Sequence, residues 1–468
     1  MKNKTFGAFV LPLGAMLLSA CGGSGGDKIK LRIGFWPEPT ETREVAMYNL
    51  WKEAFEAENP EYTIIADPYT YDTTTIMSKF NGGTLPTVFQ TWFTEPLKLK
   101  NLNIIRPITS QLHALGWDDM MDDGMKATLT FDGEIYGVPR DGYGLGLLLN
   151  MKTFYDNGLL EKDKDGKYIL YDGQGKPLYP TSFEEIYEAS LAISEYDDTK
   201  GILICSANKN GGWQFNNIAW NFGANFQTQD EKGKWVAHLD SPESVKALSW
   251  IQKMKQDGLL LNSPSVTYDE WYSSIGSKVA MAIVGSDVLH LAQTSGGVNM
   301  DDLAFLPMPT GDGVHHTSLY GGTPFVFNKN ASDAQVEGIL KFFDYIGRSP
   351  TTSERNVAAI VDGYEVSKAK NQPVIPKIMP WKNEEYLSMA KGLETQYLSV
   401  DMDYYADFFD HIDQNKRSEE PYYTQEMYEF LDLAIQSVLT APDTASPSAL
   451  LTTANAKLQS LFDQNLNH

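Results

Sequence analysis

Cysteine is almost absent from this chain: among its 468 residues, only Cys21 and Cys205 carry a thiol. A disulfide framework is therefore excluded as the main source of stability, and a protein of this length must depend on its hydrophobic core. Cys205 ends residues 201–205, a glycine followed by apolar residues, which is typical of a buried strand. We therefore expect Cys205 to be an inert, buried thiol.

Positive charge is also scarce, because 38 Lys and Arg face 61 Asp and Glu and give a formal net charge of -23 at pH 7. A surface of this sign repels nucleic acid phosphates and anionic lipid headgroups, so a nucleic acid partner is not expected. The simplest interpretation is an acidic surface that keeps the protein soluble.

The common catalytic and nucleotide-binding motifs are missing. Residues 142–146 fall short of a dinucleotide loop, and there is no full phosphate-binding loop, Gly-x-Ser-x-Gly elbow or His-Glu-x-x-His. His315 and His316 are adjacent, so in a strand they point to opposite faces and make a poor metal pair. A glycosidase needs only two carboxylates ~5 to 10 Å apart, and a secreted glycosidase therefore stays an alternative.

Long hydrophobic runs are missing beyond the first 20 residues, and residues 145–149, the best later run, have only the length of a strand. At the start, Lys2 and Lys4 precede an apolar segment over residues 6–18, and Leu-Ser-Ala-Cys follows at 18–21. This order resembles the signal peptide of bacterial lipoproteins, and the apolar segment is too short to cross a hydrocarbon core of ~30 Å.

The resemblance implies a signal peptide over residues 1–20 and a lipid on the sulfur of Cys21. Residues 21–28, which include four glycines, would then be a flexible linker. Loss of the signal peptide removes two lysines and no acid, so the formal charge moves from -23 to -25. We expect a protein anchored by lipid on the extracytoplasmic face of the cell membrane, with a transmembrane anchor and an incidental cysteine as the alternative.

Strand-like and helix-like segments alternate from the start of the remaining chain. Strand patterns at 31–36, 62–66 and 88–90 are separated by helical patterns from Thr42 to Asn59 and over 74–80. This βαβαβ order predicts a parallel sheet covered by helices, and thus an α/β fold.

Further helix starts occur later in the chain. Ser182 with Glu185, and Ser332 with Gln335, have the spacing of capping boxes, while Ser241 precedes a proline suited to the first turn of a helix. Residues 278–284 form a strand pattern, and the chain from about residue 383 is helical and rich in Tyr, Phe and acids.

Several local patterns occur in the order found in one known family. They are Phe-Glu-Ala-Glu-Asn-Pro at 55–60, Gly-Gly-Thr-Leu-Pro-Thr-Val at 82–88 with Thr87 in place of the usual aspartate, Asp-Gly-Glu-Ile-Tyr-Gly-Val-Pro at 132–139 followed by Leu-Asn-Met at 149–151, Asp-Ser-Pro-Glu at 240–243, and Gly-Ser-Lys-Val-Ala-Met at 276–281. Together they resemble extracellular solute-binding proteins of the maltodextrin-binding type, which serve carbohydrate ABC importers.

The resemblance implies a two-lobe, periplasmic-binding-protein-like fold of class II, with hinge crossovers and a ligand cleft between the lobes. Crossovers are expected near residues 139–143, 306–310 and 348–352. Lobe 1 would then comprise residues 29–139 plus 311–347, and lobe 2 residues 140–310 plus 348–468. The expected partners are a carbohydrate ligand, which is captured by lobe closure, and the permease subunits of an ABC transporter; the protein would be a monomer and not an enzyme.

Ligands of such sheets lie at the carboxyl ends of strands, and a sugar needs planar hydrogen-bonding groups beside aromatic faces. The predicted strand exits and crossovers supply these candidates: Trp36, Glu38, Gln90, Trp92, Asp141, Tyr143, Trp213, Ser286, Asp287, Gly322 and Thr323. Core packing is the alternative for the tryptophans, and pairing with Arg140 is the alternative for Asp141. Trp220, Tyr404 and Tyr405 fit core packing better than ligand binding.

An acidic stretch has the spacing of a calcium-binding loop, with Glu161, Asp163, Asp165 and Asp172 as the candidate ligands. A turn that leads into a hairpin over residues 171–179 explains the same residues. The turn is the preferred interpretation, and no cofactor is expected.

Two further functions remain open at this stage. The protein could report its ligand to a membrane sensor kinase, or it could bind a non-sugar solute such as a polyamine. A polyamine would require the acids Glu38, Asp141 and Asp287 to converge.

Overall fold

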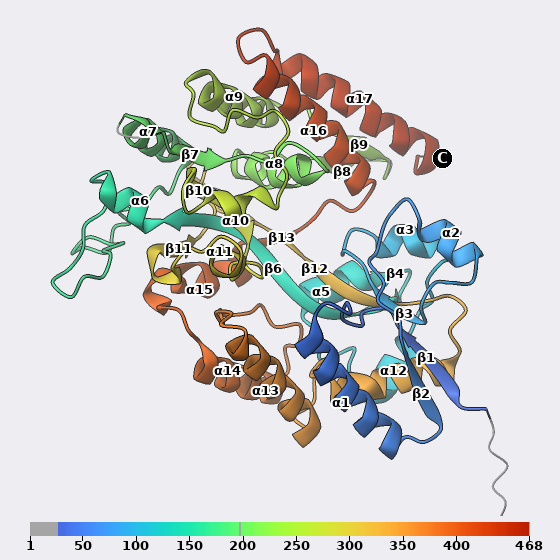
Figure 1. Cartoon of the computed structure of the whole chain (residues 1–468). Coiled ribbons are helices and arrows are strands. Elements are labelled where there is room, and N and C mark those ends of the chain that lie inside the picture. The colour runs from blue at the N-terminus through green and yellow to red at the C-terminus, as the bar shows by residue number, and fades with distance from the viewer. Residues whose placement is uncertain (1–26, 196–197, 468) are drawn as a thin grey trace, which may run out of the picture.

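The computed structural model describes residues 27–195 and 198–467. The signal peptide, Cys21 and most of the predicted linker therefore lie outside the described residues. Within the described residues, nine strands join in one sheet with the path β2-β1-β3-β12-β6-β10-β7, while β11 pairs with β6 and β13 with β12. Figure 1 shows that β6 and β12 run between an upper and a lower group of helices.

The first lobe is the lower group and begins with the predicted βαβαβ unit, in which β1 is parallel to both β2 and β3. Its elements are β1 (Ile29–Ile33), α1 (Thr42–Glu58), β2 (Tyr62–Ala66), α2 (Ile76–Asn81), β3 (Val88–Gln90), α3 (Pro96–Asn101), α4 (Thr109–Leu115), α5 (Asp123–Leu129), β4 (Thr130–Phe131), β5 (Glu134–Ile135), α12 (Asp333–Tyr345), α13 (Glu354–Ala369) and α14 (Glu384–Tyr397).

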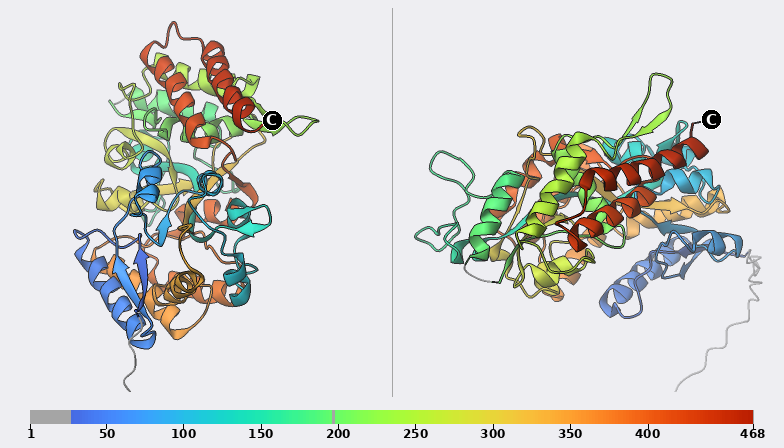
Figure 2. Two further views of the ribbon diagram at one scale, coloured as in Figure 1. Left: turned by 90° about the vertical axis from the view of Figure 1, so that its right-hand side faces the viewer. Right: turned by 90° about the horizontal axis from the view of Figure 1, so that it is seen from above.

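The second lobe is the upper group. It contains α6 (Met151–Asp156), α7 (Phe183–Ser194), β7 (Lys200–Leu203), α8 (Asn210–Asn221), β8 (Gln227–Gln229), β9 (Trp235–Ala237), α9 (Pro242–Gln256), α10 (Glu270–Ser274), β10 (Val279–Gly285), α11 (Leu291–Thr294), η1 (Met300–Asp302), β11 (Leu303–Leu306), η2 (Met402–Tyr404), α15 (Ala406–Asn415), β13 (Lys416–Ser418), α16 (Thr424–Thr440) and α17 (Pro447–Asn465). Figure 2 shows α17 on the outer surface of this lobe.

Local sequence signals fix several of these boundaries. Ser182 and Ser332 form complete capping boxes at the starts of α7 and α12, as predicted. The Ser241 hydroxyl accepts a hydrogen bond from the Ser244 N–H at the start of α9, where a proline occupies the first turn.

Each lobe has its own hydrophobic core. Leu31, Val88 and Phe343 belong to the core of the first lobe, which also buries Trp381 and Tyr386. The core of the second lobe buries Cys205 and Trp220, as predicted, together with Tyr404 and Tyr405. These four side chains therefore serve packing.

Two long strands connect the cores. β6 (Gly137–Asn150) has Val138 in the first core and residues 145–149 in the second, while β12 (Ser318–Phe327) has Phe325 in the first and Leu319 in the second. The strands pair antiparallel, with Gly142 opposite Gly322. The predicted crossover at 139–143 coincides with this middle part of β6.

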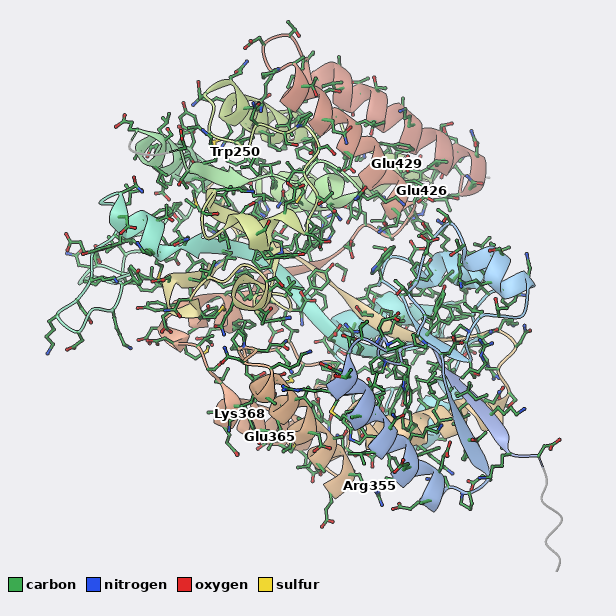
Figure 3. All side chains as sticks on the ribbon, viewed as in Figure 1. Trp250, Arg355, Glu365, Lys368, Glu426 and Glu429 are labelled. Carbon is green, nitrogen blue, oxygen red and sulfur yellow. The ribbon has the colours of Figure 1, made fainter. Side chains whose placement is uncertain are left out.

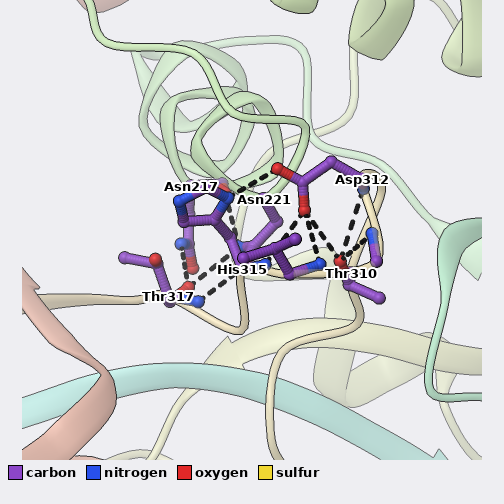
Figure 4. A network of polar contacts seen from close by, with 8 residues as sticks. Asn217, Asn221, Thr310, Asp312, His315 and Thr317 are labelled. Carbon is purple, nitrogen blue, oxygen red and sulfur yellow. Dashed lines mark hydrogen bonds and ion pairs between the residues drawn. The ribbon is translucent and has the colours of Figure 1, made fainter.

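The other two crossovers differ from the expectation. Residues 310–317 do not cross but stay on α8, because Asn217 and Asn221 donate to the Thr317 carbonyl and Asn221 accepts from its N–H at 2.7 Å (Figure 4). In the same loop the Asp312 carboxylate accepts the N–H groups of Val314 and His315. The chain crosses only afterwards, along β12.

The assignment of residues 348–468 to the second lobe also differs from the packing. Helix α13 contacts α1 and α12, α14 contacts α13, and Tyr386 and Ala390 of α14 belong to the first core. Between α13 and α14 the chain contacts the second core at Ile375, and after α14 it rejoins that core at Val400 and Met402. The expectation placed this boundary too early because the helical pattern from residue 354 onward does not reveal which core its apolar side faces.

Candidate functional site

Two hollows lie between the lobes, near the middle of β6 and β12. The hollow that we call the aromatic hollow has a volume of ≈ 340 Å³, and it is lined by residues that include Trp92, Tyr143, Trp213, Tyr268 and Tyr428. A second hollow of ≈ 240 Å³, the basic hollow, is lined by residues that include Arg140, Arg348 and Lys377. Asp287 lines both, so the two hollows are neighbouring parts of one interlobe cleft.

The aromatic hollow receives one tryptophan from each lobe. Trp92 follows β3, is 44% exposed, and has its ring centroid 5.3 Å from that of Tyr71. Trp213, in the first turn of α8, contacts Tyr143 and Tyr268 with ring centroids 6.1 and 5.0 Å apart. Aromatic faces on opposite lobes suit the flat C–H faces of a solute that touches both.

The start of α8 is held by a carboxylate from α16. Lys209 has a positive φ of 68°, and its N–H donates to Asp432 at 2.6 Å, while the Gly212 N–H donates to the same carboxylate at 2.7 Å. This contact turns Asn208, Lys209 and Trp213 toward the aromatic hollow.

The hinge strands contribute paired charges and backbone groups. The Arg140 guanidinium donates to Asp141 at 2.6 Å, and the Thr323 N–H donates to the other Asp141 oxygen at 3.3 Å. Ser286 exchanges hydrogen bonds with Gly144: its hydroxyl accepts at 3.2 Å and its N–H donates at 3.0 Å. Both contacts tie the cleft floor to the strands that cross between the lobes.

Two carboxyl groups in the cleft hold their protons unusually strongly. Surrounding protein, and then the Asp141 charge, raise the pKa of Asp287 to about 7, although its side chain remains open to the cleft. Burial raises the pKa of Glu419 to about 7, and its carboxyl oxygen accepts from the Tyr428 hydroxyl at 2.8 Å. Burial also keeps the pKa of Tyr143 and of Tyr268 well above 10, so both phenols remain neutral. The cleft thus offers neutral donors as well as acceptors.

Most of the predicted site residues meet in these hollows. Trp92, Asp141, Tyr143, Trp213, Ser286, Asp287, Gly322 and Thr323 line one hollow or both. Asp141 also makes the predicted pair with Arg140.

Three predicted site residues line neither hollow. Trp36 is only 6% exposed and packs in the first core against Tyr48, with ring centroids 5.2 Å apart. Gln90 lies within β3 opposite Phe325, and Glu38 lies exposed beyond β1, where its N–H donates to Glu41. Trp36 lines neither hollow because the chain after β1 turns its side chain into the first core.

Several lining residues were not predicted. Asn208, Lys209 and Asn210 follow β7 and could have been found by the strand-exit rule. Glu419, Gln425, Tyr428, Arg348 and Lys377 come from the last third of the chain and have no local signal that points to the cleft.

The acidic stretch that has the spacing of a calcium-binding loop forms turns instead. The Asp163 carboxylate accepts the N–H groups of Asp165 and Lys167, and the Asp172 carboxylate accepts those of Gln174 and Lys176, so each closes a turn. Across 27–195 and 198–467, no group of three or more His, Cys, Asp or Glu side chains could hold a metal ion. The turn-and-hairpin alternative accounts for the acidic spacing.

Two lobes with separate cores, crossing strands and a cleft between them define the class of two-lobe solute-binding proteins. The chain belongs to the family of bacterial extracellular solute-binding proteins, whose sequence model matches residues 51–364. No curated protein sequence is significantly similar to it. None of the helices in the described part of the chain is long and apolar enough to cross a membrane.

Solved structures share the fold at low sequence identity. An ABC substrate-binding protein of Listeria monocytogenes, solved with cycloalternan, has a TM-score of 0.68 at 13% identity, over 93% of this chain and 100% of that one. The GacH receptor of Streptomyces glaucescens, solved with acarbose, has a TM-score of 0.66 at 15% identity, over 93% and 98%. UgpB of Mycobacterium tuberculosis, solved with glycerophosphocholine, has a TM-score of 0.69 at 15% identity, over 94% and 100%.

Proposed function

We propose that this protein captures a carbohydrate in its interlobe cleft and delivers it to the permease of an ABC importer. The observation that carries the proposal is the aromatic hollow, in which Trp92 of the first lobe and Trp213 of the second line the same space. Tryptophan rings offer large contact areas to sugar faces, and Asn208, Asn210 and Gln425 offer amides to sugar hydroxyls. The sugar-bound relatives with the same fold support this ligand class.

Lobe closure is the mechanism that this arrangement supports. A ligand that contacts both lobes stabilises the closed form by its differential affinity. Two contacts bridge the lobes here: Lys98 of α3 pairs with Glu426 of α16 at 2.9 Å, and Gln425, which lines the aromatic hollow, donates to Thr94 at 3.2 Å. Glu426 lies at the end of α16 that faces the first lobe (Figure 3).

The lipid anchor belongs to the same proposal. A lipid on Cys21 and a glycine-rich linker would keep the binding protein near its permease and leave it free to reorient. Mass spectrometry of the membrane fraction tests this: a diacylglyceryl mass on a chain that begins at Cys21 is expected, and Cys21→Ala should release the protein into the medium.

The polyamine alternative is weakened by the cleft. It requires Glu38, Asp141 and Asp287 to converge, whereas Glu38 lines neither hollow and Asp141 is paired with Arg140. Signalling to a sensor kinase would use the same cleft; deletion of the neighbouring permease, which abolishes uptake but not signalling, separates the two roles.

Thermal shift and small-angle X-ray scattering with mono-, di- and oligosaccharides test the proposal. One class of saccharide should raise the melting temperature and reduce the radius of gyration. No shift with any saccharide, or hydrolysis of one of them by the pure protein, contradicts it.

A further inference from the structure

The basic hollow concentrates cations in an acidic protein. Its lining includes Arg140, Arg348 and Lys377, whereas the chain as a whole has a formal net charge of -23. The three come from separate parts of the chain: the crossing strand β6, the loop after α12, and the segment between α13 and α14. The fold therefore brings them together without any local run of basic residues.

The acids in the same hollow do not balance these cations. The Asp141 carboxylate already forms an ion pair with the Arg140 guanidinium, at 2.6 Å. Surrounding protein and the Asp141 charge raise the pKa of Asp287 to about 7, so it is only partly ionised near neutral pH. Burial lowers the pKa of His290, which leaves its ring neutral there.

Arg348 and Lys377 have no carboxylate partner within 4.0 Å among residues 27–195 and 198–467. The Lys377 ammonium instead lies over the ring of Tyr364, 4.7 Å from its centroid. Surrounding protein, and then the neighbouring Arg348 charge, lower the pKa of Lys377 although its side chain is open to the cleft, and the charges of Glu394 and Asp141 only partly oppose this. Two like charges that face one concave space repel each other until an anion enters between them.

We infer that the basic hollow holds the anionic group of an acidic saccharide, with Arg348 and Lys377 as its ligands and the sugar rings in the adjoining aromatic hollow. The inference rests on the proposed function and names the chemical class of its ligand. Arginine binds a carboxylate or a phosphate through two parallel N–H groups, and lysine adds a point charge.

The position of the hollow couples this group to lobe closure. Arg348 and Tyr364 belong to the first lobe, and Ser286 and His290 to the second. An anion in this space therefore contacts both lobes. The acid group would therefore bind the closed form more tightly than the open form, and so it would favour closure as well as binding.

Isothermal titration with matched sugars tests the inference. The probes form three matched sets. The first is glucose, glucuronate and glucose 6-phosphate, and the second is galactose, galacturonate and galactose 6-phosphate. The third is digalacturonate with its neutral counterpart galactobiose. At least one acid should bind about tenfold or more tightly than its neutral counterpart, because hydrogen bonds to charged groups are the stronger ones. Its affinity should fall as NaCl is raised. The uronates and the 6-phosphates carry their charge at the same carbon of the sugar. Comparison of their affinities therefore shows whether the hollow prefers a carboxylate or a phosphate.

Arg348→Gln and Lys377→Met should each weaken the acid about tenfold and leave the neutral sugar unchanged, while Arg348→Lys should retain part of the preference. Lys246→Gln, which removes a charge from the exposed side of α9, is the matched control. Melting temperatures without ligand verify that each variant folds.

Two results overturn the inference and leave the proposed function intact: neutral sugars that bind as tightly as their acids, and an acid whose affinity neither variant changes. Binding of no saccharide at all overturns the proposed function as well.

Discussion

Trp92 and Trp36 both follow strands at the same edge of one sheet, yet they have different environments. Trp92 is 44% exposed in the aromatic hollow, and Trp36 is 6% exposed against Tyr48. Trp36 therefore serves packing, whereas Trp92 is free to make the ligand contact that we propose.

Trp92→Ala should weaken saccharide binding by about tenfold or more, since truncation of a tryptophan at the centre of a site costs ~2 kcal/mol or more. Its melting temperature should stay close to that of the parent, because little packing is lost. Trp36→Ala should instead destabilise the protein by about 3–5 kcal/mol. Titration and thermal unfolding of both variants check this, and a large loss of stability in Trp92→Ala with no loss of affinity would reverse the assignment.

Glu394, on α14, makes stability depend on pH. Burial raises its pKa to about 7, although its carboxylate accepts the Lys377 N–H at 2.8 Å. The native state therefore keeps a proton that the unfolded chain releases near its ordinary pKa of ~4.3. Because the native state binds more protons in this window, stability falls as pH rises from about 4.3 to about 7.

Glu394→Gln should reduce the slope of the unfolding free energy against pH in that window by the equivalent of about one bound proton. An amide does not titrate, and it can still accept the N–H. Denaturant unfolding between pH 4 and 8 measures this. Glu384→Gln, on the exposed side of the same helix, should leave the slope unchanged. An equal slope in the parent and the Glu394 variant would contradict the raised pKa.

At the scale of elements, α8 and α16 approach closely where they position the site. A Cβ on Gly212 would lie 2.2 Å from the carbonyl oxygen of Tyr428 and 2.4 Å from its Cα, so backbone atoms would have to move. The absence of a side chain at Gly212 is thus what lets Trp213 and Tyr428 line the same hollow.

Gly212→Ala should destabilise the protein by about 1–3 kcal/mol through overpacking, and it should weaken saccharide binding because the two helices separate. Gly363→Ala on α13 is a control of opposite sign: its Cβ meets nothing within 4 Å, so it should stabilise by about 0.5–1 kcal/mol. Thermal unfolding and titration check both. A neutral Gly212→Ala would show that the helices can shift apart without cost.

At the scale of the whole molecule, Lys98 and Glu426 join lobes that have separate cores. Both side chains are about one third exposed, so the pair contributes ~0.2–1 kcal/mol to closure. Lys98→Met and Glu426→Gln should each weaken ligand binding up to about fivefold, and the double variant should be no weaker than either single one. Lys152→Met removes a pair within α6 and should have no effect. Additive losses would show that the pair does not act across the cleft.

Much of this architecture could be predicted from the sequence because it depends on local signals. The βαβαβ unit, the capping boxes of α7 and α12, and the buried Cys205 and Trp220 follow from residue periodicity and caps. The lobe of α13 and α14 did not follow, because an apolar helix face does not specify its partner. The basic hollow could not be predicted either, because Arg140, Arg348 and Lys377 are far apart in the sequence and meet only in the folded chain.

Strand β6 has a consequence for how the molecule opens. One continuous run of 14 residues pairs with β12 in the first lobe and with β10 and β11 in the second. Its central amides therefore exchange with deuterium only when both lobes lose their sheets together. Slow exchange along β6 would show that the two lobes unfold as a single cooperative unit, even though the proposed closure moves them as separate bodies.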